Sequence, residues 1–109
     1  MANIHNKENI SEIKIERHFL LFCPMGGKHY DADVVVTFIP DIEIMDYCDS
    51  EEYFKSMEGG EYTVEAATSD IFNYIRELIH PKKLSVVLRA TNGVHSPVTV
   101  KKEGLYSEE

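Results

Sequence analysis

The chain has 109 residues, the size of one domain with one hydrophobic core, and a net charge of −8. Its 43% hydrophobic and 28% charged residues are typical of globular proteins, and no stretch reaches the roughly 18 apolar residues that a membrane span requires. The acidic balance gives no whole-molecule attraction for nucleic acid. It does not exclude a smaller basic group in the C-terminal part, formed by Lys82, Lys83, Arg89, Lys101 and Lys102.

The first ten residues, MANIHNKENI, are polar and predict a disordered tail over residues 1–10, followed by a single domain over residues 11–109. This segment lacks the basic start and apolar middle of a secretion signal, so we expect a cytoplasmic protein. Cys23 and Cys48 are then expected to be free thiols, because disulfides are rare in that compartment.

Alternating apolar residues predict a strand over residues 13–23, and Leu20 and Phe22 make its second half apolar on both faces. The segment PMGGKHYD provides a turn. The β-branched run ADVVVTFI predicts a partner strand over residues 32–39, which Pro40-Asp41 ends.

Two helices are predicted next. The segment DSEEYFKSM is typical of a short helix with Asp49 as N-cap and Glu52 completing a capping box, and it ends at Gly59-Gly60. Apolar residues at three- and four-residue spacing predict a longer helix that begins after the N-cap Thr63 and ends at His80-Pro81.

The segment KLSVVLRA, residues 83–90, predicts a strand, TNG a tight turn, and VHSPVTVKK a return strand that Pro97 marks as an edge or a bent strand. The order β-β-α-α-β-β predicts an α+β fold, with a four-stranded antiparallel sheet and the helices on one face. Such a sheet has two long edges, so we expect oligomerisation that joins sheets edge to edge.

Two stretches, FCPMGGKHYDADVVVTFIPD and YTVEAATSDIFNYIRELIHPKKLSVV, resemble parts of QueF, the NADPH-dependent nitrile reductase of queuosine biosynthesis. The resemblance covers residues 19–100. QueF belongs to the tunnelling-fold (T-fold) proteins, in which ββααββ units associate into rings around a β-barrel. The resemblance therefore implies a T-fold unit that oligomerises into a β-barrel ring.

The resemblance also implies roles for single residues. Cys23 would be the nucleophile that adds to the nitrile of 7-cyano-7-deazaguanine (preQ0), and Glu65 would hold the heterocycle. A carboxylate can accept two hydrogen bonds from adjacent ring N–H and amino donors. The first turn of a helix also favours a negative charge.

The chain departs from QueF at the stretch that binds NADPH there, Glu-Ser-Lys-Ser-x-Lys-x-Tyr. The corresponding residues read DYCDSEEY, with Cys48 and Glu51 in place of the lysines, and this acidic segment would repel a dinucleotide phosphate. The chain keeps the nucleophile and the anchoring Glu but lacks the residues that bind the reductant. In this it resembles the short QueF-like amidinotransferases. These convert preQ0 in tRNA to archaeosine with ammonia, and the resemblance implies no cofactor.

In that chemistry the Cys23 thiolate adds to the nitrile, and the resulting thioimide takes up a proton before ammonia displaces the sulfur. The catalytic Asp of QueF falls on Tyr30, with Asp31 next, so Asp31, Tyr30 and His29 are the candidate proton donors. In strict strand alternation Asp31 points away from Tyr30, and a bulge at Gly26-Gly27 would be needed to turn it inward.

The implied partners are tRNA carrying preQ0, ammonia and further copies of the chain, in pentamer rings or a decamer. His95 and Ser96 are candidate substrate contacts, although residues after such turns often satisfy only local backbone. No metal is expected, because the Cys and His residues lack metal-site spacing.

Two other functions remain open: a divergent NADPH-dependent nitrile reductase, and a non-catalytic binder of purine- or pterin-like rings. Without the resemblance, Cys23 is interpreted as a packed residue at the end of a strand and Glu65 as a surface charge.

Overall fold

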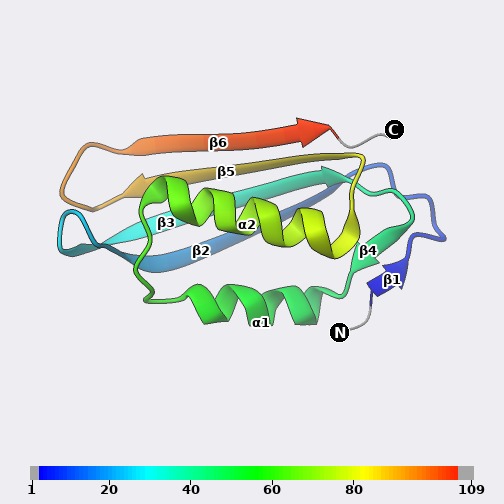
Figure 1. Cartoon of the computed structure of the whole chain (residues 1–109), viewed down its shortest axis with the longest axis horizontal. Coiled ribbons are helices and arrows are strands. Elements are labelled where there is room, and N and C mark those ends of the chain that lie inside the picture. Colours follow the sequence, from blue (N-terminus) through cyan, green and yellow to red (C-terminus); the bar gives the residue numbers. More distant parts are fainter. Residues whose placement is uncertain (1–2, 106–109) are drawn as a thin grey trace.

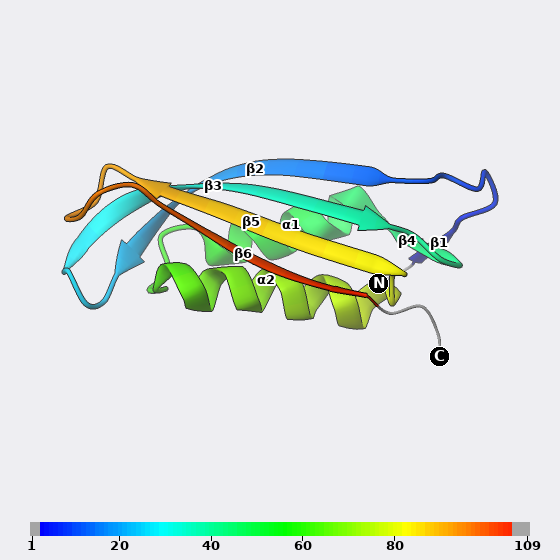
Figure 2. The same ribbon diagram turned by 90° about the horizontal axis from the view of Figure 1, so that it is seen from above.

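The computed structural model describes residues 3–105, which form a four-stranded antiparallel sheet, a two-stranded sheet and two helices. The elements are β1 (Asn3–His5), β2 (Ile13–Cys23), β3 (Lys28–Ile39), β4 (Glu43–Met45), α1 (Tyr47–Met57), α2 (Val64–Ile79), β5 (Lys83–Thr91) and β6 (Val98–Leu105). The larger sheet has the order β2-β3-β5-β6, and both helices lie on one of its faces (Figure 1, Figure 2). The predicted α+β class and the four-stranded antiparallel sheet are confirmed. The sheet does not close into a barrel within one chain, and β2 and β6 are its edge strands.

Side-chain alternation gives the sheet one buried and one polar face. Along β2 and β3 the pairing is continuous from Ile13↔Phe38 to Cys23↔Lys28, so every second side chain points to the helices. The face away from the helices, here called the outer face, is largely polar and exposed. It carries Lys14, Glu16, His18, Asp33, Arg89 and Lys101.

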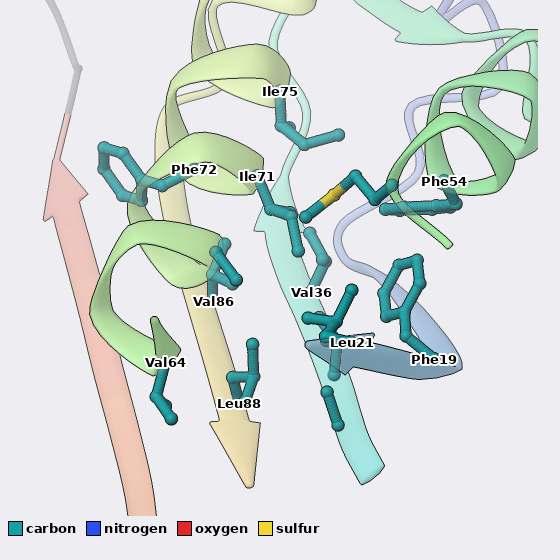
Figure 3. Packing of buried hydrophobic residues seen from close by; sticks show 14 of the residues in the cluster. Phe19, Leu21, Val36, Phe54, Val64, Ile71, Phe72, Ile75, Val86 and Leu88 are labelled. Carbon is teal, nitrogen blue, oxygen red and sulfur yellow. The ribbon is translucent and has the colours of Figure 1, made fainter. Parts of the chain in front are cut away.

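The core lies between the sheet and the helices. In Figure 3, Ile71 of α2 points toward Val36 of β3, and Phe54 of α1 lies over Phe19 of β2. The Phe19 and Phe54 rings meet edge to face with centroids 5.7 Å apart. The apolar spacing that predicted α2 is thus the spacing that buries it, and the N-cap Thr63 is confirmed by its side chain, which accepts a hydrogen bond from the Ala66 amide.

The predicted disordered tail is wrong for part of its length. Residues Asn3–His5 form β1, which pairs antiparallel with β4, and the Asn6 amide donates to the Ile42 carbonyl at 2.7 Å. Strands of three residues are too short for an alternation pattern to identify them. Residues 1–2 of the predicted tail, and residues 106–109 of the predicted domain, lie outside the described residues.

The predicted N-cap of α1 is also wrong. The helix begins at Tyr47, and its N-cap is Asp46, whose side chain accepts a hydrogen bond from the Cys48 amide at 2.8 Å. Asp49 lies within the first turn. Ser50 is therefore inside the helix, and it is buried on the same side as Phe54 and Met57.

We expect Asp46→Ala to lower the free energy of unfolding by about 1 kcal/mol, because an orphan amide at the start of α1 loses its acceptor. Asp49→Ala, which removes another Asp carboxylate, in the first turn of the helix, is expected to lower the free energy of unfolding by only a few tenths of a kcal/mol. Urea unfolding of the two variants measures the difference. Equal losses would mean that Asp46 does not cap the helix.

Neither helix within residues 3–105 is both long enough and apolar enough to cross a lipid bilayer.

Candidate functional site

Cys23 lies at the end of β2, on the side of the sheet that faces the helices. Its side chain is half-buried against the core and its thiol is free. The turn that follows folds back onto it: the Gly26 amide donates to the Cys23 sulfur at 3.3 Å, and the Gly27 amide donates to the Cys23 carbonyl at 2.8 Å. Gly27 has a φ of 67°, a left-handed conformation that favours glycine. The sulfur is therefore at the surface and not sealed in the core.

The segment between the helices brings the start of α2 to this cysteine. Residues 59–62 run beside the edge of β2 and bond to it through the backbone. The Gly59 amide donates to the Leu20 carbonyl, and the Phe22 amide donates to the Gly60 carbonyl. The Tyr62 amide donates to the Phe22 carbonyl. These bonds are 2.7 to 3.0 Å long. Leu20 itself stays 43% exposed on the outer face, so the expectation of a β2 buried on both sides is not met in the single chain.

Tyr30 connects the two halves of the site. It is buried on the helix side of β3, opposite Leu21, and its hydroxyl donates to the Tyr62 carbonyl at 2.7 Å. Burial raises the pKa of Tyr30 to about 12, and electrostatic interactions with Cys23 and Glu65 add to the rise. Tyr30 therefore keeps its proton at neutral pH, and both Cys23 and Glu65 lie within electrostatic range of its hydroxyl.

Glu65 lies in the first turn of α2, and its side chain is exposed. Within residues 3–105 its carboxylate forms no ion pair. The β2–β3 turn, the β5–β6 loop and the beginning of α2 lie at the same end of the molecule (Figure 1, Figure 2). Together they place a thiol and a free carboxylate around one open surface.

Asp31 is on the other face of the sheet. The register of β2 and β3 runs through it without a bulge, so the hypothesis that a bulge turns Asp31 inward is wrong. Its carboxylate accepts a hydrogen bond from Asn92 at 2.7 Å and lies 3.2 Å from His18 Nε2. The other ring nitrogen of His18 lies 2.7 Å from Asp33, and this hydrogen bond is the main cause of the raised pKa of His18.

The remaining candidates divide between the two faces. His29 contacts the Phe22 ring edge to face on the outer side, away from Cys23. His95 and Ser96 lie in the exposed β5–β6 loop at the Cys23 end, where His95 Nδ1 is 2.8 Å from the Ser96 carbonyl. The Ser96 carbonyl is thus a local partner of the His95 ring, and both side chains are exposed in this loop.

The acidic segment at the start of α1 serves the fold. Asp46 caps the helix, Glu51 forms a two-point ion pair with Arg17 of β2 at 2.9 and 3.1 Å, and Tyr53 stacks on Tyr74 with centroids 3.8 Å apart. No sequence pattern indicates the Arg17 pair or the role of the Tyr62 carbonyl. A backbone group carries no residue-type signal, and the Arg17 pair links distant parts of the chain.

The C-terminal basic residues do not form one patch at Cys23. Lys82 and Lys83 lie before and at the start of β5, at the end of the molecule away from Cys23 (Figure 1). Lys101 pairs with Glu103 at 2.7 Å, and Lys102 donates to Ser69 and lies over the Phe72 ring. Lys28, which pairs with Cys23 in the β2–β3 register, is the exposed cation that the hairpin places at the site. Within residues 3–105, no three His, Cys, Asp or Glu side chains are arranged to hold a metal ion.

The sequence matches no protein-family model and no curated protein. The fold does match solved structures, among them a crystal structure of the archaeosine synthase QueF-Like in the apo form. That match has a TM-score of 0.79 and 18% sequence identity, and it covers 87% of this chain and 94% of the other. The chain thus shares the fold of that protein, in agreement with the ββααββ unit that the sequence resemblance implied.

Proposed function

We propose that the protein is an amidinotransferase that converts preQ0 in tRNA to archaeosine with ammonia. One observation carries the proposal: a half-buried thiol held in a glycine turn lies at the same end of the fold as the exposed carboxylate of Glu65. The fold shared with an archaeosine synthase supports it. These two groups are those that the reaction requires, a nucleophile and an anchor for the heterocycle.

The reaction needs no change of oxidation state. Cys23 adds its sulfur to the nitrile carbon, one C–N π bond breaks, and the nitrogen takes up the proton that the thiol has released, which gives a thioimide. Ammonia then adds to the same carbon, the C–S bond breaks, and the sulfur leaves as a thiolate. The product is the amidine, and the sum of the steps is the addition of ammonia to the nitrile.

Tyr30 and Asp31 have different places in this scheme. The Tyr30 hydroxyl is on the side of Cys23 but already donates to Tyr62, so it holds the β3 strand to the start of α2. Its high pKa makes it a poor proton donor at neutral pH. Asp31 faces away from Cys23, and we assign it no proton transfer.

Assembly into a ring is part of the proposal. The site is open on the surface of the single chain, and the sheet ends in two edge strands, β2 and β6. Joining β2 of one copy to β6 of the next would extend the sheet into a barrel and place a neighbouring copy beside the site. In such a pentamer or decamer the polar outer face would line the barrel.

A tRNA substrate is compatible with the acidic chain if recognition centres on one base. Enzymes that act on a nucleobase take it out of the stack into a pocket, where hydrogen bonds to the base supply much of the selectivity. Glu65 would provide those bonds, and Lys28 and His95 are exposed side chains at the same end that can contact phosphates or the base.

The test is an assay of tRNA that contains preQ0, incubated with ammonium and the protein, followed by mass spectrometry of the digested nucleosides. We expect the wild type to form the amidine, and Glu65→Gln to lower kcat/KM by about 10- to 100-fold, because a charge-assisted hydrogen bond contributes about 1.5–3 kcal/mol. Glu77→Gln, at the far end of the same helix, is the control and is expected to leave the rate unchanged.

Other outcomes identify the alternative functions. Consumption of NADPH with free preQ0 and no amidine would show a nitrile reductase and contradict the proposal. Binding of preQ0 that depends on Glu65, with no reaction under any condition, would show a non-catalytic binder.

A further inference from the structure

We propose that Val94, in the β5–β6 loop, is a positioning residue that holds the Gly26 amide on the sulfur of Cys23, and that Asp31 anchors this loop through Asn92. The inference deepens the proposed function, because it rests on Cys23 as the reacting group. It gives Asp31 a role that requires no proton transfer.

The first step is the contact between Val94 and Gly26. A Cβ atom built on Gly26 would lie 2.6 Å from Cγ2 of Val94, so the valine side chain occupies the space that any other residue at position 26 would need. Val94 is 56% exposed and lies outside the core. Its side chain packs against the turn at Gly26, and the Gly26 amide points at the Cys23 sulfur.

The second step is the anchoring of the loop from both faces of the sheet. Asn92 adopts a left-handed φ of 60°, which asparagine tolerates, and its side chain donates to Asp31 at 2.7 Å on the outer face. On the inner face, Gly93 lies against Tyr30, since a Cβ on Gly93 would be 3.2 Å from the Tyr30 Cβ. The next residue is Val94, so these two contacts determine where its side chain lies.

The third step is the effect on the sulfur. An amide N–H directed at the sulfur stabilises negative charge there, both on the thiolate that forms before the attack and on the thiolate that leaves. A hydrogen bond to sulfur is useful only if the turn holds it in place, because an exposed turn that includes two glycines has many other conformations. Val94 and its anchor restrict that turn.

The experiment uses the full chain with four variants: Val94→Ala, Asn92→Gly, Asp31→Ala, and Met25→Ala as control. Met25 lies in the same turn and is 85% exposed. Asn92→Gly keeps the left-handed backbone accessible and removes the hydrogen bond to Asp31, so it provides a second route if Asp31→Ala does not fold. The readout is the rate of Cys23 alkylation by iodoacetamide, divided by the rate of Cys48 in the same molecules.

Iodoacetamide needs neither preQ0 nor a proton donor, so the ratio reports the thiolate character and exposure of Cys23 independently of the nitrile chemistry. We expect Val94→Ala and Asn92→Gly each to lower the ratio by about 3- to 10-fold, the equivalent of one modest hydrogen bond. The double variant should fall no further than the lower single variant, because both changes act through the same loop. With preQ0, the maximal rate of adduct formation should fall while the half-saturating preQ0 concentration stays constant.

An unchanged ratio in Val94→Ala, or single effects that add in the double variant, would overturn the inference. It would also be overturned if Asp31→Ala slowed the reaction with preQ0 while Asn92→Gly did not, since that is the pattern of a proton donor. If no adduct with preQ0 forms but the alkylation ratios change as expected, the proposed function fails and the role of the loop stands.

Discussion

Cys23→Ala is expected to abolish the covalent adduct that the wild-type protein forms with preQ0. The expected loss of amidine formation exceeds about 10³-fold, because removing a nucleophile removes the reaction path itself. The structure supports this selectivity: Cys23 lies at the end of β2 with the Gly26 amide on its sulfur, and Cys48 is exposed near the start of α1. Intact-mass measurement after incubation with preQ0 detects the thioimide directly.

Cys48→Ala is the matched control for this experiment, since it makes the same chemical change at the second thiol of the chain. It is expected to retain both the adduct and the activity. An adduct that survives in Cys23→Ala, or that maps to Cys48 in the wild type, would contradict the assignment of the nucleophile.

Phe54→Ala is expected to lower the free energy of unfolding by about 3–5 kcal/mol, the range for removing a large side chain from a tightly packed core. Phe54 is 1% exposed and is the residue through which α1 meets Phe19 of β2. The loss is a large fraction of the about 5–15 kcal/mol that stabilises a typical domain. Guanidinium unfolding followed by circular dichroism measures it.

Tyr47→Ala, on the same helix, provides the comparison. Tyr47 is 50% exposed, so we expect a cost below about 1 kcal/mol. Similar losses for Tyr47→Ala and Phe54→Ala would mean that the ring of Phe54 is not the contact that attaches α1 to the sheet.

The parts of the fold that the sequence predicted well are those with long patterns. The strand Ile13–Cys23 and the helix Val64–Ile79 were predicted with their observed bounds, because each repeats its apolar spacing over several periods. The start of α1 and the strands β1 and β4 were not, because a helix cap can be any of several nearby Asp or Ser residues and a strand of three residues has no period.

In the site, too, features with a local sequence pattern were predicted and contacts between distant residues were not. Alternation along β3 placed Asp31 opposite to Tyr30, as the structure does, and the error lay in supposing a bulge. The contact of Val94 with Gly26 and the bond from Tyr30 to the Tyr62 carbonyl join residues far apart in the chain. No local pattern encodes such pairs, so only the folded chain reveals them.

The residues beside β2 limit how far the sheet can grow on that side. The Leu20 amide already donates to the Glu58 side chain, and residues 59–62 bond the Leu20 carbonyl and both outward groups of Phe22. The His18 carbonyl accepts from Arg17. Because outward groups come from alternate residues, Lys14 and Glu16 are the positions on this edge that the described residues leave for another strand. A strand from another molecule can therefore form only a short ladder with β2, in a single register. Continued edge-to-edge aggregation through this strand is disfavoured.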